Sequence, residues 1–274
     1  MERFVDGRPE AGFRVNVDPT NPGQFFACCG LMEMADRLWN GAEGWFDNGK
    51  FSLRLLNTEM ATDAALAHLL KKLSSLILTQ VDPEDPYSTP IKVPTPFNFT
   101  LGWWQETDPA VKQLKTWAGT MQSFRIACAM QKCLSSPDFH VEDLFNVGRF
   151  VFDPEDRRKK VEPYYFDARR GANARPIDVG FSHDPLKMVT MAFPAVEFLC
   201  LIGLQRFRPM PADKKRVFEY FTWVDPLDAH IAPIAACGLL RRDDDLGYRF
   251  EVAFRTPQRK HKAFTSANPF RRRR

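Results

Sequence analysis

The residues of this sequence best suited to chemistry are the arginines of a short polar segment. Arg169, Arg170 and Arg175 lie close together, with Gly171 and Asn173 among them. A guanidinium group binds phosphate with two parallel hydrogen bonds, and an asparagine amide can read the edge of a base. The pattern predicts a contact with nucleic acid, and the alternative is a solvated loop without a ligand.

Two features near this loop favour the same chemistry. Tyr164 and Tyr165 come directly before it and can stack on bases, although they can equally belong to a strand packed in the core. A run of four cations lies a few residues earlier, and such a run is also typical of a solvated surface. Its members are Arg157, Arg158, Lys159 and Lys160.

One histidine admits a different reading of the same region. His183 follows the arginine-rich loop and is next to Asp184. A metal-independent ribonuclease needs a base near the attacking 2′-hydroxyl and cations on the phosphate, so His183 with the loop arginines is a candidate set. The alternative is that His183 and Asp184 cap the helix or turn that follows.

Motifs for other chemistry are absent from the sequence. It contains no Cys-x-x-Cys and no His-x-x-x-His spacing, and Cys128 and Cys133 are separated by a spacing that zinc fingers do not use. The glycine-rich loops that cradle phosphates and the Gly-x-Ser-x-Gly elbow are also missing. We therefore expect a protein that is not an enzyme and that uses neither a metal nor another cofactor.

The charge of the chain is divided unevenly along its length. Residues 1–156 contain 14 Lys and Arg against 21 Asp and Glu, whereas residues 157–274 contain 24 against 13. The net charges of −7 and +11 suggest a polyanionic partner for the second part. The basic end of the chain, with Arg271 to Arg274, supplies much of this excess. We expect an acidic lobe over residues 1–156 and a basic lobe over residues 157–274.

The cysteines and the apolar runs indicate the cellular compartment in which we expect the protein. The six cysteines lie mostly inside apolar segments, as free buried cysteines do. The first residues are charged and do not resemble a signal peptide, and no apolar run reaches the length of a membrane span. We expect a reduced, cytoplasmic protein without a membrane partner.

The first half of the chain reads as alternating strands and helices. Residues 13–17 alternate like a strand, and Asn21 with Pro22 can begin a helix over residues 23–39. A hairpin follows around Asp47-Asn48-Gly49, and residues 58–80 show helical spacing of leucines. The remaining expectations are an extended proline-rich stretch over 83–96, a strand over 97–104, a helix over 108–134, and a short helix and strand over 138–152.

The second half repeats this alternation. We expect a strand over 163–166, helices over 192–206 and 230–240, and strands over 217–224 and 248–254. Residues 256–274 are polar and basic, which is typical of a tail that is disordered without its ligand. Gly30-Leu31 and Gly203-Leu204 hold similar places in two proline-started helices. This likeness indicates either a duplication or the ordinary similarity of small α+β units.

These elements predict an α+β fold with mixed or antiparallel sheets flanked by helices. The order of strand, helix and hairpin in residues 13–56 suggests a ferredoxin-like unit near the N-terminus.

The same segment carries a family resemblance. It begins with Val15-Asn16-Val17-Asp18-Pro19-Thr20-Asn21-Pro22-Gly23-Gln24-Phe25-Phe26-Ala27-Cys28-Cys29-Gly30-Leu31, continues to Trp39, and extends through Gly44-Trp45-Phe46 and Lys50-Phe51-Ser52-Leu53. Over residues 13–56 the chain resembles a CRISPR-associated effector family of type I-G systems, formerly type I-U, which looks like a short form of the large subunit of Cascade-type complexes.

The resemblance implies a role without catalysis. A subunit of this kind sits with CRISPR RNA and the other backbone subunits, recognises the short motif flanking a DNA target and helps to open the duplex. A separate helicase–nuclease, recruited to the complex, cuts the DNA. Two alternatives remain at this stage, a guide-RNA-processing endoribonuclease that uses His183 and an assembly scaffold that makes protein contacts only.

Overall fold

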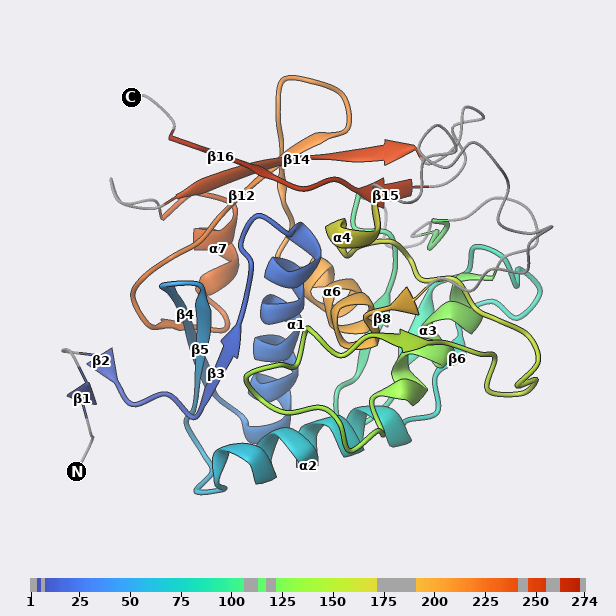
Figure 1. The fold of residues 1–274 in the computed structure, drawn as a ribbon, viewed down its shortest axis with the longest axis horizontal. Helices are drawn as coiled ribbons and strands as arrows, with labels where there is room; N and C mark the ends of the chain where they lie inside the picture. Colours follow the sequence, from blue (N-terminus) through green and yellow to red (C-terminus); the bar gives the residue numbers. More distant parts are fainter. Residues whose placement is uncertain are drawn as a thin grey trace.

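The fold is α+β, as the sequence predicts. The computed structural model describes residues 4–5, 8–105, 113–116, 122–171, 191–240, 246–254 and 262–271 (Figure 1). Within these ranges every pair of neighbouring strands is antiparallel. None of the helices in the described ranges has the length and apolar character needed to cross a bilayer.

Helix α1 (Pro22–Trp39) begins and ends where the sequence predicts. The Asn21 side chain accepts hydrogen bonds from the amides of Gly23 and Gln24, and Pro22 occupies the first turn. Asn40 ends the helix in the left-handed conformation, with φ of 53°. Residues 22–36 are all buried, so α1 is a central helix that is covered on every side.

The strands β3 (Phe13–Asn16), β4 (Ala42–Asp47) and β5 (Lys50–Leu55) form the N-terminal sheet. β5 lies between β3 and β4, so α1 is the crossover of a split β-α-β unit. This is the first half of a ferredoxin-like arrangement. The second half does not follow, because the fourth strand of the sheet is β13 (Leu227–Asp228), which pairs with the outer edge of β4.

The C-terminal sheet is built around β14 (Gly247–Phe254). Its strand order is β11-β12-β14-β15, with β16 also paired to β14. The other strands are β11 (Met210–Pro211), β12 (Val217–Phe221), β15 (Lys262–Phe264) and β16 (Asn268–Phe270). The prediction of a disordered tail is therefore wrong for residues 262–270. Buried Phe264 and the edge-on contact of Phe270 with Phe221 hold these strands in place.

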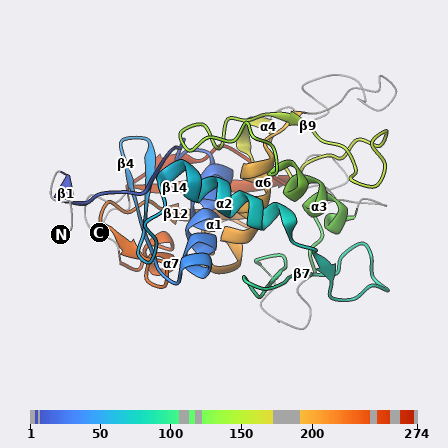
Figure 2. The same cartoon turned by 90° about the horizontal axis from the view of Figure 1, so that it is seen from below.

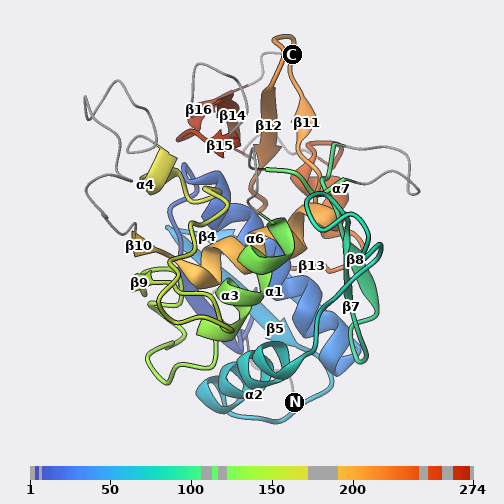
Figure 3. The ribbon, with the colours of Figure 1, turned by 90° about the vertical axis from the view of Figure 1, so that its right-hand side faces the viewer.

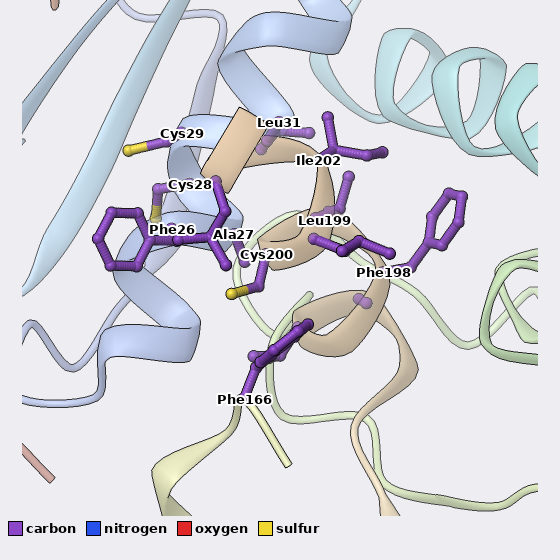
Figure 4. Packing of buried hydrophobic residues seen from close by; sticks show 14 of the residues in the cluster. Phe26, Ala27, Cys28, Cys29, Leu31, Phe166, Phe198, Leu199, Cys200 and Ile202 are labelled. Carbon is purple, nitrogen blue, oxygen red and sulfur yellow. The ribbon is translucent and has the colours of Figure 1, made fainter. Parts of the chain in front are cut away.

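Helix α6 (Pro194–Arg206) lies against α1 at the centre of the molecule (Figures 1 and 4). The two helices cross where Gly30 meets Gly203. A Cβ atom on Gly30 would lie 2.0 Å from the carbonyl oxygen of Leu199, and one on Gly203 would lie 2.0 Å from that of Phe26. The contact is reciprocal, because each glycine faces the carbonyl four residues before the other. Only glycine permits so close an approach of two backbones.

The central helix pair joins the two halves of the chain. The ring of Phe25 packs on Phe46 of β4 and on Tyr220 of β12, so α1 contacts both sheets. The indole nitrogen of Trp223 donates to the carbonyl of Gly44 at 2.7 Å. One hydrophobic core contains side chains from both sides of residue 156, where the sequence predicts a boundary between an acidic and a basic lobe.

The remaining elements surround this centre (Figures 1 and 2). Helix α2 (Thr62–Ser75) packs on α3 (Ser123–Cys133), and the Gln131 amide donates to the carbonyls of Leu73 and Leu76. The prediction of one helix over 108–134 is wrong, since residues 113–116 are not helical. The short elements are β1 (Phe4–Val5), β2 (Arg8–Pro9), β6 (Thr79–Gln80), β7 (Ile91–Val93), β8 (Phe99–Leu101), β9 (Arg149–Phe150), α4 (Ala168–Gly171), β10 (Met191–Ala192) and α7 (Ala232–Ala236).

Candidate nucleic-acid interface

The arginine-rich loop lies only partly within the described residues. Asn173, Arg175 and His183 fall outside them. Arg169 and Arg170 lie in the short helix α4, which follows a buried segment of chain. Among these predicted residues, Arg169 is therefore the one whose side-chain contacts the structure describes.

Arg169 is held by protein groups, which compete with the predicted phosphate contact. Its guanidinium donates to both oxygens of Asp167, the shortest distance being 2.6 Å, and to the carbonyl of Phe145 at 2.7 Å. It also donates to the Asn146 side chain and lies 3.6 Å from the centre of the Phe193 ring. These contacts occupy most of its donors and one face of its plane.

Tyr164 and Tyr165 are buried, so neither ring can stack on a base in this fold. Tyr164 is fully buried, stacks on Phe166, and donates its hydroxyl to the carbonyl of Ser123. Tyr165 is 3% exposed and donates to a carboxylate oxygen of Glu162 at 2.7 Å. Of the two roles that the sequence allowed, the structure selects packing in the core.

A buried polar network explains why the 164–169 segment is held so firmly. The Asn21 amide donates to Asp167 at 2.9 Å, and the Asn21 oxygen accepts from the Ala168 amide at 3.0 Å. Glu197, in the first turn of α6, accepts from the amides of Phe166 and Asp167. Burial and the neighbouring Asp167 raise the pKa of Glu197 to about 8. The network links the starts of both central helices.

The basic run at 157–160 occupies the turn of a β-hairpin. Phe152 pairs with Lys160, and the Asp153 amide donates to the carbonyl of Lys159 at 2.8 Å. Arg157, Arg158 and Lys159 are exposed and Lys160 is half-buried. The structure thus brings all four predicted cations together at one end of the hairpin.

The hairpin is anchored to the body of the protein through two buried residues. Val151 is 1% exposed, and Asp153 is 2% exposed with a 2.8 Å ion pair to Arg125 of α3. Burial alone would raise the pKa of the Asp153 carboxyl, but the amide of Glu155 and the Arg125 guanidinium hold it below its usual value. Asp153 therefore remains ionised and anchors the turn.

The face of the hairpin opposite to this anchor carries exposed aromatic rings. Phe150 is 61% exposed and Phe152 is 41% exposed. Phe150 ends β9, and Phe152 forms an isolated bridge with Lys160 two residues later, so the two exposed rings belong to one short stretch of chain. Met191 of β10 pairs with Phe150 and is 38% exposed, and β9 and β10 lie at the periphery of the molecule (Figures 2 and 3).

We call this region the hairpin surface. It consists of Phe150, Phe152, Met191, Arg157, Arg158, Lys159 and Lys160. Two carboxylates, those of Glu155 and Asp156, lie within the turn, and Asp156 pairs with Arg158 at 3.3 Å. This pair is weak because the Arg158 side chain is 93% exposed. The surface combines flat apolar rings with cations that a polyanion can reach.

Sequence reasoning missed Phe150 and Phe152. The alternation of Phe150, Val151 and Phe152 identifies a strand with two faces, but it does not say which face is buried. The sequence offers one signal in Asp153, which lies two residues after Val151 and therefore on the same side of the extended chain. Its polar side chain suggests that this side is exposed. Only its pairing with Arg125 shows that this polar position points inward.

A second polar region is less suited to phosphate. A cavity of about 350 Å³ over the C-terminal sheet is lined by Lys214 and Arg249 among others. Arg249 pairs with the buried Glu219 at 2.9 Å, and Asp213 and Glu251 also line the cavity. Carboxylates thus balance the cations here.

Within the described residues no cluster is arranged to hold a metal ion, and three of the thiols are deeply buried. No group of three or more His, Cys, Asp or Glu side chains within them is arranged to hold a metal ion. Cys28, Cys29 and Cys200 are buried, and burial raises the pKa of each thiol well above its usual value. Such thiols behave as apolar side chains.

Comparisons of this chain with protein-family models, with curated proteins and with solved structures found no match.

Proposed function

We propose that this protein is a non-catalytic, nucleic-acid-binding subunit of a type I CRISPR RNA-guided surveillance complex, acting in antiviral defence. The observation that carries the proposal is the hairpin surface, where Arg157, Arg158 and Lys159 project from a firmly anchored turn beside two exposed rings. The resemblance over residues 13–56 supplies the class of complex. The proposed ligands are CRISPR RNA and target DNA, including the motif that flanks the target.

The placement of the hairpin surface supports separate structural and binding roles for two parts of the chain. The segment that carries the resemblance forms α1 and the N-terminal sheet, whose side chains are mostly buried in the core. The hairpin surface is formed by separate residues at the periphery. In this proposal the core unit holds the protein in shape, and the hairpin contacts the nucleic acid. The cytoplasmic complex would also contain the other backbone subunits and would recruit the helicase–nuclease.

The proposal is tested by the salt dependence of binding. The purified chain is titrated onto a fluorescently labelled guide RNA and onto target DNA over a series of salt concentrations. The variant in which Arg157, Arg158 and Lys159 are all changed to Gln should bind more weakly and with a shallower salt dependence. For single strands each phosphate contact contributes about 0.7 to the slope, so three lost contacts lower it by about 2.

The control variant removes three other exposed cations, Lys71 and Lys72 of α2 and Lys92 of β7. It has the same net charge as the hairpin variant. If both variants bind alike at every salt concentration, the hairpin surface is not the interface. If the chain binds neither nucleic acid, alone or with its protein partners, the proposed function fails. Cleaved RNA at the end of the incubation would contradict the absence of catalysis.

A further inference from the structure

We infer that the hairpin surface binds single-stranded nucleic acid, with two consecutive bases stacked on Phe150 and Phe152. The inference rests on the proposed function and names its ligand more closely. Large apolar side chains that are exposed close to one another in the chain commonly mark a binding surface. Here they are a pair of aromatic rings next to a cluster of cations, which is the combination that single strands require.

The spacing of the rings argues against a duplex. The Cα atoms of residues two apart in an extended chain are separated by roughly 6.6 Å, whereas the bases of a duplex are stacked about 3.4 Å apart. Rings carried at this backbone spacing suit bases that have been drawn apart from one another, each lying on its own ring. The sheet-surface aromatics of RNA-binding domains hold two or three bases in the same manner.

The chemistry of the rings leads to the same ligand. A phenylalanine ring has no hydrogen-bond donor or acceptor, so it cannot read the hydrogen-bonding pattern on the edge of a paired base in a groove. It offers only a flat apolar face, which a base can cover once it is unpaired and unstacked. Met191, beside Phe150, extends the apolar area with a flexible side chain. The stacking platform should therefore tolerate any sequence.

The position of the cations completes the arrangement. Lys160 is directly opposite Phe152 on the neighbouring strand, and the turn with Arg157 and Arg158 lies just beyond. A strand whose bases lie on the two rings thus has its phosphates within the field of these cations. The firm anchor through Asp153 and Arg125 means that the rings and cations keep their relative places before the ligand binds.

The experiment compares single-stranded and double-stranded oligonucleotides of the same length and composition. Phe150→Ala and Phe152→Ala should each weaken single-strand binding by roughly 5- to 150-fold, the range that stacking of a base on an aromatic ring supplies. Duplex binding, which depends on the cations, should stay the same. Phe150 is 61% exposed and Phe152 is 41% exposed, so the variants should fold, and thermal unfolding curves check this. Ile77→Ala, at a position that is 80% exposed just after α2, is the matched control.

A second measurement reports stacking directly. In Phe150→Trp the new indole should bind single strands at least as well as the original ring, and its fluorescence should be quenched on binding. The native protein, titrated in parallel, gives the background from its own tryptophans. Phe150→Leu keeps the apolar character but removes the flat ring, so it should behave like Phe150→Ala.

The outcomes separate the two proposals. If the Phe variants bind single strands like the wild type while the triple cation variant is impaired, the stacking inference is wrong and the proposed function stands. If neither the wild-type protein nor any variant binds either oligonucleotide, both the stacking inference and the proposed function fail. If the Phe variants lose a protein subunit of the complex but bind single strands normally, the rings form a protein contact and the inference is overturned.

Discussion

The crossing of α1 and α6 gives a sharp prediction about stability. Gly30→Ala places a methyl group 2.0 Å from the Leu199 carbonyl oxygen and 2.8 Å from its carbon. Gly203→Ala makes the same clash with the Phe26 carbonyl. Both obstacles are helix backbone, so no side chain can rotate away. The helices must separate by about 1 Å, since contacts of this kind under 3.0 Å are essentially never seen.

The magnitude follows from two opposing effects. Replacing glycine by alanine inside a helix favours folding by about 1 kcal/mol. Overpacking a well-filled core costs typically about 1–3 kcal/mol and sometimes more, and this clash belongs at the upper end because both central helices must shift. We expect each single variant to lose about 2 kcal/mol in the free energy of unfolding. Urea titrations followed by circular dichroism measure it.

The double variant provides the decisive comparison. Once the first methyl group has separated the helices, the second finds part of its space already open. The double variant should therefore lose less than the sum of the two single losses, by about 0.5 kcal/mol or more. Gly12→Ala is the control, because its Cβ would lie 3.4 Å from the nearest atom, the Leu53 oxygen. Single variants as stable as the wild type, or strictly additive losses, would refute the described crossing.

Two further predictions concern the buried network. Burial and Asp167 raise the pKa of Glu197 from 4.5 to about 8, so the folded protein keeps a proton that the unfolded chain releases. This contribution to stability is present below pH 4.5 and is lost as the pH rises to 8. Glu197→Gln should flatten that decline in urea titrations, and an unchanged slope would count against it. Arg169→Gln breaks a pair with fully buried Asp167 and should cost about 2 kcal/mol of stability, discounted from the value for fully buried pairs because Arg169 is partly exposed. Its single-strand affinity in a filter-binding assay should stay at the wild-type value, and a large loss by the folded variant would restore Arg169 as a ligand contact.

The elements that the sequence predicted well are those with local causes. Asn21 and Pro22 begin α1 through hydrogen bonds and a backbone angle that involve only neighbouring residues. The hairpin of β4 and β5 turns at Asn48 and Gly49, both with positive φ, which Asn and Gly adopt at low cost. Signals of this kind need no distant partner, so they can be read from a few consecutive residues.

The candidate site shows the limit of such reading. Tyr164 and Tyr165 were candidates for stacking on bases and are buried, whereas Phe150 and Phe152, for which the sequence predicted no role, are exposed. Aromatic residue types do not differ enough to decide between these places. The decision came from partners far along the chain, such as the Ser123 carbonyl that accepts from Tyr164.

By itself the sequence determined the α+β class, the proline-started central helices, the hairpin of β4 and β5, and the position of the cationic run at 157–160. Tertiary structure alone decided that Gly30 meets Gly203, that β13 joins β4, and that β15 and β16 add to β14. The physical reason is the same in each case. Hydrogen bonds within a helix or a tight turn join near neighbours, but strand pairing, close helix contacts and burial depend on surfaces that only the complete fold brings together.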